Sequence, residues 1–317
     1  MNAADSLSPL VPDAEPDAAE AMALGATMYV PIVHPDVGAI IAGDKHLRLR
    51  SVVLCLEDAL HARDVERGLH LLSDLLSDPA ANGAPLGRAS GPRLFLRPRD
   101  LVMARRIVRL EGIAKVHGFV IPKVATETLA PWWRLAEEAD LRLMPTLERA
   151  WVFDPIALRE FAHALDDQDR RQLVALRVGG NDLLASMGLR RVRGRTVYEG
   201  PLAWGLSQLM CQLGSHGYPL TAPVFDVLDD PDTLARECRL DAEFGFVGKT
   251  AVHPAQIRII ERGFAVTEAT LTLAREALAD DADAVFRREG LMLEPATHRA
   301  WARRTVARAA AYGTCGS

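Results

Sequence analysis

The stretch from Arg142 to Asp182 decides the fold. It opens with the apolar run Arg142-Leu-Met-Pro-Thr-Leu-Glu148 and continues through a segment with helical spacing at Asp154–Leu165. A second apolar run, Leu173–Val178, then leads into Gly179-Gly-Asn-Asp182. An apolar run, a longer helical segment and a second apolar run are typical of a strand–helix–strand unit in a parallel sheet. The first run leads directly into Glu148, and the second is followed within four residues by Asp182.

The same alternation recurs along the chain. Strands are predicted at Met28–Pro31, Val52–Glu57, Arg93–Arg97, Gly118–Lys123, Arg142–Glu148, Leu173–Val178, Ala222–Asp226 and Phe246–Thr250. Helices are predicted near Pro35–Ala42, Ala62–Leu76, Asp100–Leu110, Thr126–Ala139, Asp154–Leu165, Asp182–Met187, Leu202–His216 and Pro231–Phe244. Eight alternating units favour an α/β fold of the (β/α)8 TIM-barrel type over an open sheet.

Two segments flank the predicted barrel, which spans residues 24–266. Residues 1–23 are rich in Ala, Asp, Pro and Glu and lack the basic start and apolar stretch of a secretory signal, so a flexible tail is predicted. Residues 267–317 contain Ala- and Arg-rich helical patterns around Gly290-Leu-Met-Leu-Glu294-Pro. This segment is predicted to be a helical lid or oligomerisation segment that packs on the barrel or on a neighbouring subunit.

Composition narrows the functional classes. The 317 residues are 49% hydrophobic and 25% charged, which is typical of a soluble globular protein. A net charge of −5 argues against a nucleic-acid partner. The four cysteines show no CxxC spacing, which argues against a disulfide framework or a thiolate zinc site. No apolar run approaches the roughly 20 residues that span a bilayer, so no membrane partner is expected and a cytoplasmic location is predicted.

Polar groups follow almost every predicted strand. They are Glu57-Asp58, Arg97, Lys123, Glu148, Asn181-Asp182, Asp226, Lys249 and His253. The carboxyl ends of barrel strands converge on one face, and that face carries the active site in TIM-barrel enzymes. These residues are therefore expected to line one bowl.

Glu148 and Asp182 are the candidate metal ligands. They end neighbouring strands, and Mg²⁺ takes oxygen ligands from one or two carboxylates together with waters and substrate oxygens. The absence of an HxxxH or clustered Cys/His pattern disfavours zinc. The alternative is structural, with Glu148 in a salt bridge and Asp182 as a helix N-cap.

Three other basic features have both functional and structural interpretations. Arg97 can bind a substrate carboxylate through two hydrogen bonds, or form an ion pair at the barrel rim with Glu57 or Asp58. Lys123 can form a Schiff base, but neighbouring acidic residues favour a protonated, electrostatic role. The loop Arg190-Arg-Val-Arg-Gly-Arg195 is interpreted as solvated, with anion binding as the alternative.

Seven collinear motifs between Met28 and Ile260 together resemble one family. They are Tyr29-Val-Pro, Cys55-Leu-Glu-Asp-Ala, Leu96-Arg-Pro, Val120-Ile-Pro-Lys, Thr146-Leu-Glu, Gly180-Asn-Asp-Leu and Gly245-Phe-Val-Gly-Lys-Thr-Ala-Val-His-Pro-Ala-Gln-Ile. In this order they resemble the citrate lyase β-subunit-like group of the HpcH/HpaI aldolase superfamily, which includes malyl-CoA lyases.

This resemblance implies a TIM barrel, a Mg²⁺ cofactor, retro-aldol or retro-Claisen chemistry on 3-hydroxyacyl thioesters, and a homotrimer or hexamer. It places Glu148 and Asp182 at the metal carboxylates and Arg97 at the arginine that binds the oxo-acid part. Glu294 stands where many members have an aspartate that acts as acid or base in the neighbouring subunit's site. Gly25-Ala26 stand where the family usually has Arg-Ser, which is expected to remove contacts to a coenzyme A phosphate.

The working hypothesis is a Mg²⁺-dependent carbon–carbon lyase. Arg97 binds the substrate, Glu294 or Asp58 takes part in proton transfer, and Glu57, Lys123 and Asn181 orient the ligands and substrate. The substrate is a small hydroxy-carboxylate, either free or as a thioester of coenzyme A or an acyl carrier. The alternatives are a metal-dependent aldolase acting on free 2-oxo acids and a non-catalytic barrel that binds carboxylates.

Overall fold

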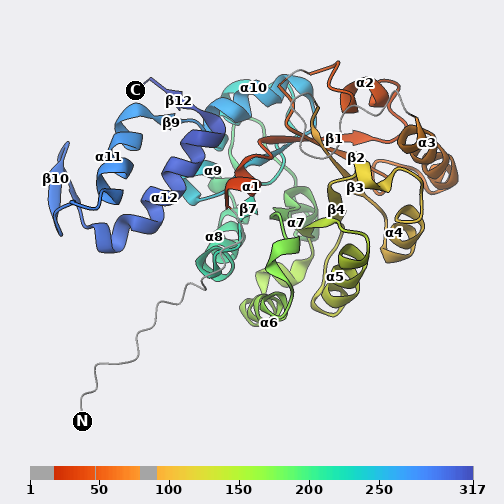
Figure 1. Ribbon diagram of the computed structural model, residues 1–317, viewed down its shortest axis with the longest axis horizontal. Coiled ribbons are helices and arrows are strands. Elements are labelled where there is room, and N and C mark those ends of the chain that lie inside the picture. Colours follow the sequence, from red (N-terminus) through yellow and green to blue (C-terminus); the bar gives the residue numbers. More distant parts are fainter. Residues whose placement is uncertain (1–17, 47, 79–90, 317) are drawn as a thin grey trace, which may run out of the picture.

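Eight parallel strands form one sheet in the order β7-β6-β5-β4-β3-β2-β1-β8 (Figure 1). The computed structural model describes residues 18–46, 48–78 and 91–316. The strands are β1 (Ala26–Pro31), β2 (Ser51–Cys55), β3 (Arg93–Arg97), β4 (Gly118–Ile121), β5 (Arg142–Leu147), β6 (Leu176–Val178), β7 (Leu220–Thr221) and β8 (Lys249–Ala251). Hydrogen bonds from the Val247 amide to the Leu220 carbonyl (2.9 Å) and from the Ala222 amide to the Gly248 carbonyl (2.8 Å) join β7 to β8. The predicted (β/α)8 barrel is confirmed.

Helices connect the strands and cover the outside of the barrel. They are α2 (Val37–Ile41), α3 (Val65–Ser77), α4 (Leu101–Ile107), α5 (Leu129–Glu138), α6 (Pro155–Asp166), α7 (Gly180–Ser186), α8 (Leu202–Gln212), α9 (Pro231–Phe244) and α10 (Pro254–Gly263). Two of them, α7 and α8, follow β6. The helix after the last strand, α10, was not among the predicted helices, and it completes the eighth unit.

Most predicted strands differ from the structure at one or both boundaries, and the last three differ most. The seventh was predicted at Ala222–Asp226, but β7 is Leu220–Thr221, and Pro223 within the predicted range has no amide hydrogen to donate to a ladder. The sixth and eighth were predicted to begin at Leu173 and Phe246, whereas β6 begins at Leu176 and β8 begins at Lys249. The apolar character of these segments extends beyond the paired residues because both faces of a barrel strand are buried.

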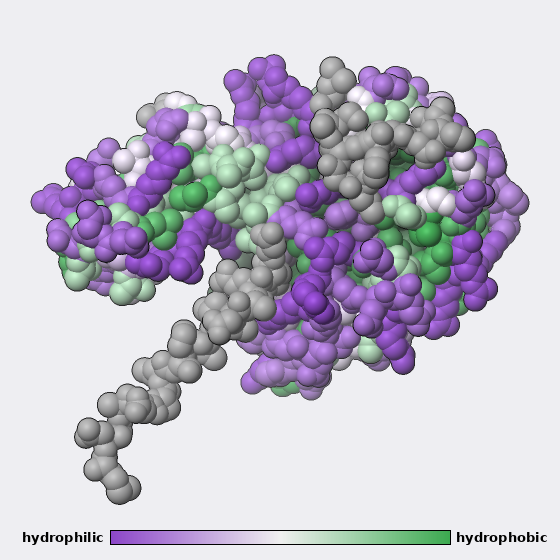
Figure 2. Space-filling view, viewed as in Figure 1, coloured by the Kyte–Doolittle hydropathy of each residue, from purple (hydrophilic) through white to green (hydrophobic). Residues whose placement is uncertain are grey.

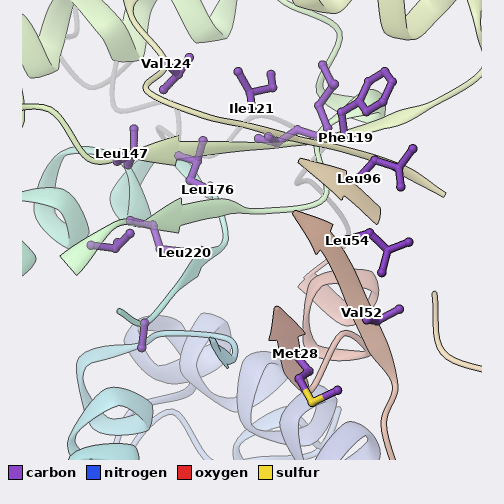
Figure 3. Packing of buried hydrophobic residues seen from close by; sticks show 14 of the residues in the cluster. Met28, Val52, Leu54, Leu96, Phe119, Ile121, Val124, Leu147, Leu176 and Leu220 are labelled. Atoms are coloured by element: carbon purple, nitrogen blue, oxygen red, sulfur yellow. The ribbon is translucent and has the colours of Figure 1, made fainter. Parts of the chain in front are cut away.

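Side chains alternate between two apolar layers, because successive residues of a strand point to opposite faces. Figure 3 shows residues of the outer layer, including Met28, Val52, Leu54 and Leu96, which pack in the core between the strands and the helices. The inner layer fills the barrel interior. It contains Val53, Phe95, Val120, Met144 and Val247.

A short helix, α1 (Ala18–Met22), packs into the amino end of the barrel. Ala21, Met22 and Leu24 are fully buried in the same cluster as Val53 and Phe95. Residues 1–17 of the predicted tail lie outside the described residues. The predicted boundary at residue 23 is wrong, because α1 buries its apolar side chains in the barrel interior.

The C-terminal segment packs beside the barrel. It comprises β9 (Val266–Thr267), α11 (Glu268–Leu278), the hairpin of β10 (Phe286–Arg288) and β11 (Leu291–Leu293), α12 (Pro295–Tyr312) and β12 (Thr314–Cys315), which pairs with β9. The Tyr312 hydroxyl donates to the Val247 carbonyl at 2.6 Å, at the amino end of β8. The segment therefore contacts its own barrel at the amino ends of the strands. It does not form the predicted lid over the carboxyl ends of its own strands.

Hydrophilic residues cover most of the molecular face in Figure 2. Within the described ranges, no helix is long and apolar enough to cross a membrane. All four cysteines are free thiols.

Candidate active site

Arg97 lies at the centre of the predicted bowl, at the carboxyl end of β3. Its Nη2 atom is 3.1 Å from both carboxylate oxygens of Glu148, which directly follows β5. The same nitrogen is 3.0 Å from Glu57 Oε2 and 3.8 Å from Asp58 Oδ2. The strand ends therefore bring together one arginine and three carboxylates. Arg97 makes the ion pairs with Glu57 and Asp58 that its structural interpretation predicted.

Lys123 positions Glu148 through its backbone. Its φ of +48° is in the left-handed region, and its amide donates to Glu148 Oε1 at 2.6 Å. The Lys123 ammonium group hydrogen-bonds Glu57 and lies 3.2 Å from Asp58 Oδ1. Burial opposes the charged form, but these two carboxylates raise the pKa of Lys123 above its usual value. The electrostatic role is therefore favoured over a Schiff base, which needs a neutral amine.

Asp182 lies in the first turn of α7, and Gly179 brings that turn close to Glu148. A Cβ atom at Gly179 would lie 2.3 Å from the Glu148 Cβ and 2.7 Å from its Oε2. The N-cap of α7 is Gly179, so the structural interpretation of Asp182 as the N-cap is wrong. The α7 turn thus places a second carboxylate beside Glu148.

We expect Gly179→Ala to reduce kcat/KM by about 100-fold, because the added methyl group displaces the Glu148 carboxylate, and a small displacement at a reacting centre has an effect of that size. The measurement is steady-state turnover, with circular dichroism to verify folding. Gly200→Ala is the matched control, since a Cβ at that position would meet no atom of the described residues within 4 Å apart from its chain neighbours. Equal activity of the two variants would show that the close approach has no catalytic importance.

The carboxylates of the bowl interact strongly. Burial, together with the charges of Asp182 and Glu57, raises the pKa of Glu148 to about 7 against the opposing effect of Arg97 and the Lys123 amide. Burial opposes the charged form of Arg97, but Glu148 and Glu57 hold the pKa of its guanidinium above its ordinary value. Glu148 is only 4% exposed, so water does little to stabilise its negative charge. The bowl therefore has excess negative charge at Glu148, which a cation would relieve.

The remaining strand-end residues divide between the rim and the exterior of the barrel. Asn181 lies at the rim, where its amide nitrogen donates to Asp226 Oδ2 at 3.2 Å. His253 is exposed and caps the backbone of α10. Lys249 does not line the bowl, contrary to prediction. Its side chain points towards α9, where its Nζ atom lies 2.8 Å from both Glu237 Oε1 and Asp241 Oδ2.

A buried ion network surrounds Lys249. Lys249, Glu237 and Asp241 are 0% exposed. Arg191 joins them through a 2.7 Å bond from Nη1 to Glu237 Oε2, and it also donates to the Val224 carbonyl. Arg191 belongs to the loop that was interpreted as solvated, so that interpretation is wrong for this residue. The network fixes the Val224 segment that leads to Asp226 at the rim.

Two predicted positions lie away from the bowl. Gly25-Ala26 lie at the amino end of β1, where the Ala26 amide donates to Glu261 Oε1 at 2.9 Å. They cannot contact a ligand in the bowl, so their departure from Arg-Ser removes no contact there. Glu294 precedes α12, beside the hairpin at the far left of Figure 1, whereas β2, β3 and β4 lie on the right. A single chain does not bring Glu294 to its own bowl.

Arg177 was not predicted, yet it lies directly beneath the bowl. It is 1% exposed in β6, in register with Thr146, two residues before Glu148. Its Nη2 donates to Thr250 Oγ1 at 2.5 Å, and its guanidinium carbon lies 5.3 Å from the centre of the Tyr29 ring. No carboxylate among the described residues forms an ion pair with it, and its side-chain partners are the Thr27 and Thr250 hydroxyls and the Met144 sulfur. An arginine between Leu176 and Val178 in an apolar strand was the signal for this buried cation.

Comparison with known proteins shows the family. The model of the carbon–carbon bond lyase family of the TIM-barrel fold matches residues 18–314. The chain belongs to this family. As in other members, its catalytic framework is the barrel described above, and it is a carbon–carbon lyase.

Named relatives of this lyase include the (3S)-malyl-CoA thioesterase of Cereibacter sphaeroides, which is 27% identical over 273 residues, covering 78% of this chain and 91% of that protein. The L-malyl-CoA/beta-methylmalyl-CoA lyase of the same organism is 31% identical over 133 residues, or 38% of this chain and 42% of that protein.

Two solved structures share the fold. Protein CitE from Mycobacterium tuberculosis, in complex with magnesium, acetoacetate and coenzyme A, aligns with a TM-score of 0.65 and 22% identity over 91% of this chain and 99% of that chain. A citrate lyase from Burkholderia xenovorans aligns with a TM-score of 0.70 and 17% identity over 93% and 94% of the two chains.

Proposed function

We propose that this lyase cleaves a carbon–carbon bond of a 3-hydroxyacyl thioester, or forms it in the reverse direction, with Mg²⁺ held by Glu148 and Asp182. The observation that carries the proposal is the buried Glu148 carboxylate. Its burial and the charges of Asp182 and Glu57 raise its pKa, so a bound cation would stabilise the ionised form. The names of the malyl-CoA relatives and the coenzyme A complex of CitE support a thioester substrate.

The donor set fits Mg²⁺. Glu148 and Asp182 offer carboxylate oxygens, which are the ligands of a hard cation that keeps several waters or substrate oxygens. Within the described part of the chain, no group of three or more His, Cys, Asp and Glu side chains forms a cage for a metal. When bound, Mg²⁺ would act as a Lewis acid on the oxygen of the departing oxo acid.

The protein residues bind substrate and move protons. Arg97 binds the substrate carboxylate, Glu57 holds the Arg97 guanidinium in place, and the Lys123 ammonium group in turn holds Glu57. A base takes the hydroxyl proton, the carbon–carbon bond breaks, and an oxo acid and the enolate of the acyl thioester form. The enolate then takes up a proton. Asp58 at the rim and Glu294 of a neighbouring subunit are the proposed proton-transfer groups. Asn181, which donates to Asp226, is proposed to orient the substrate at the rim. This use of Glu294 requires a homo-oligomer, for which we propose a trimer or hexamer.

A substrate panel tests the proposal. Wild type and Glu148→Ala are assayed with Mg²⁺ on hydroxyacyl-CoA esters and on free hydroxy-oxo acids, and the oxo acid and the free thiol are measured separately. We expect oxo acid from the thioesters without thiol release, and no product from the variant. Turnover of free acids alone would establish the aldolase alternative. Thiol release without oxo acid would show thioester hydrolysis, and binding without turnover would contradict catalysis.

We expect the affinity for Mg²⁺ to rise about tenfold per pH unit below pH 7 and to level off above it. The carboxyl of Glu148 has a pKa raised to about 7, so protons compete with the cation until the carboxyl ionises. Isothermal titration calorimetry between pH 5.5 and 8.5 measures this dependence. A flat profile across that range would show that Glu148 does not bind the cation.

A further inference from the structure

A cavity of about 710 Å³ opens at the amino end of the barrel, away from the bowl. Three parts of the chain form it. Arg48, Leu49 and Arg50 lead into β2; Arg258, Glu261 and Arg262 lie on α10; and Ala311, Tyr312 and residues 314–316 end the C-terminal segment. Arg50 also donates to the Ala311 carbonyl at 2.7 Å, so the barrel and the C-terminal segment meet at this cavity.

One of the four arginines is neutralised within the protein. Arg50 Nη2 lies 2.5 Å from Glu261 Oε2, its Nε lies 3.2 Å from Glu261 Oε1, and its guanidinium covers the Tyr312 ring at 4.6 Å. Glu261 also accepts from the Ala26 amide, so the one acidic side chain among the described residues that line the cavity is fully engaged. Arg50 and Glu261 therefore form a fixed, neutral floor.

The other three arginines carry charge without compensation. Arg48, Arg258 and Arg262 are exposed, and they form no ion pair with any described residue. Three guanidinium groups around one cavity repel each other, and the chain as a whole has a net charge of −5. An anion in the cavity would relieve this local repulsion.

We propose that this cavity binds an organic ligand with a diphosphate or longer phosphate chain. Guanidinium groups bind phosphates through paired, charge-assisted hydrogen bonds. A single carboxylate has too few oxygens to bind three guanidinium groups, whereas a phosphate chain has enough. The volume lies within the range of about 300–1,000 Å³ for small-molecule sites, so inorganic phosphate would leave most of it empty. Leu49, Ala265 and Ala311 provide an apolar wall for the organic part. The ligand bridges the barrel and the C-terminal segment.

Binding of ADP and of pyrophosphate, each titrated by calorimetry in low-salt, metal-free buffer, tests the proposal. We expect wild type to bind both, and Arg258→Gln/Arg262→Gln to bind them about 30- to 100-fold more weakly, at roughly tenfold per charge-assisted contact. The matched control is Arg105→Gln/Arg109→Gln, a second exposed pair four residues apart that removes the same charge. It should bind within about threefold of wild type.

Two further outcomes locate the site. Glu148→Ala should bind ADP as wild type does, because the bowl is at the other end of the barrel, and this result would hold even if the proposed lyase activity failed. Hydrogen exchange should also slow in residues 311–316 when ADP is bound. The proposal is overturned if wild type binds neither probe, if both arginine pairs lose affinity equally, or if only Glu148→Ala abolishes binding.

Discussion

Replacing Glu148 with glutamine is expected to lower kcat/KM by about a thousandfold or more, which corresponds to roughly 4 kcal/mol of lost transition-state stabilisation. The neutral amide removes one of the two charges proposed to hold the cation. It also turns an NH₂ group towards Arg97, whose Nη2 lies 3.1 Å from both oxygens of Glu148. Steady-state kinetics at several Mg²⁺ concentrations measure the effect.

The loss should not come from unfolding. Because the folded-state pKa of Glu148 is raised to about 7 from 4.5, the stability of the ligand-free protein falls as pH rises through that interval. At pH 8 the ionised carboxylate is a cost that glutamine removes, so we expect the melting temperature of Glu148→Gln to equal or exceed that of wild type. Glu138→Gln makes the same glutamate-to-glutamine substitution at an exposed position on α5, so it controls for the loss of one negative charge outside the site. An active Glu148→Gln protein would contradict a cation on this carboxylate.

Lys249→Met is expected to produce the largest loss of stability, about 3–5 kcal/mol, with a melting temperature lower by about 5–10 °C. Burial disfavours the charged amine, but Asp241 and Glu237 raise the pKa of Lys249, so it is a cation between two buried carboxylates. Removing it leaves Asp241 with the Tyr198 hydroxyl, at 2.6 Å, as its remaining side-chain partner among the described residues. Urea unfolding monitored by circular dichroism measures the loss.

Two variants separate this effect from a general loss of charge. Lys45→Met removes a lysine that is 45% exposed and paired with Asp36, and its effect should stay within about 0.5 kcal/mol. Lys249→Met/Asp241→Leu removes both partners and leaves Glu237 paired with Arg191, so stability should partly return. If Lys249→Met were as stable as wild type, the buried network would have no structural importance.

The barrel and the centre of the site were predictable from short-range patterns. Apolar runs of strand length, each followed by helical spacing, require only local information. A residue directly after a barrel strand is at the carboxyl-end face whatever the details of packing. For that reason Arg97, Glu148 and Glu57 were correctly placed together, and Asp182 beside them.

What could not be predicted depends on the direction of individual side chains. Lys249 and Arg177 both lie in strands, but one points outward to α9 and the other into the barrel, and a shift of one residue in the assumed strand exchanges these faces. The helix α1 was missed because it buries only two residues, Ala21 and Met22. Two residues are too few to show the helical spacing of apolar positions. Glu294 depends on quaternary structure, which a single sequence does not specify.

The central claim is that Glu148 and Asp182 together hold one divalent cation. Electron paramagnetic resonance of added Mn²⁺ counts bound ions directly and needs no substrate. We predict one Mn²⁺ per chain, displaced by Mg²⁺, with affinity lowered at least tenfold in both Glu148→Gln and Asp182→Asn and unchanged in Glu138→Gln. Binding of Mn²⁺ that is equally tight in both site variants would contradict the claim.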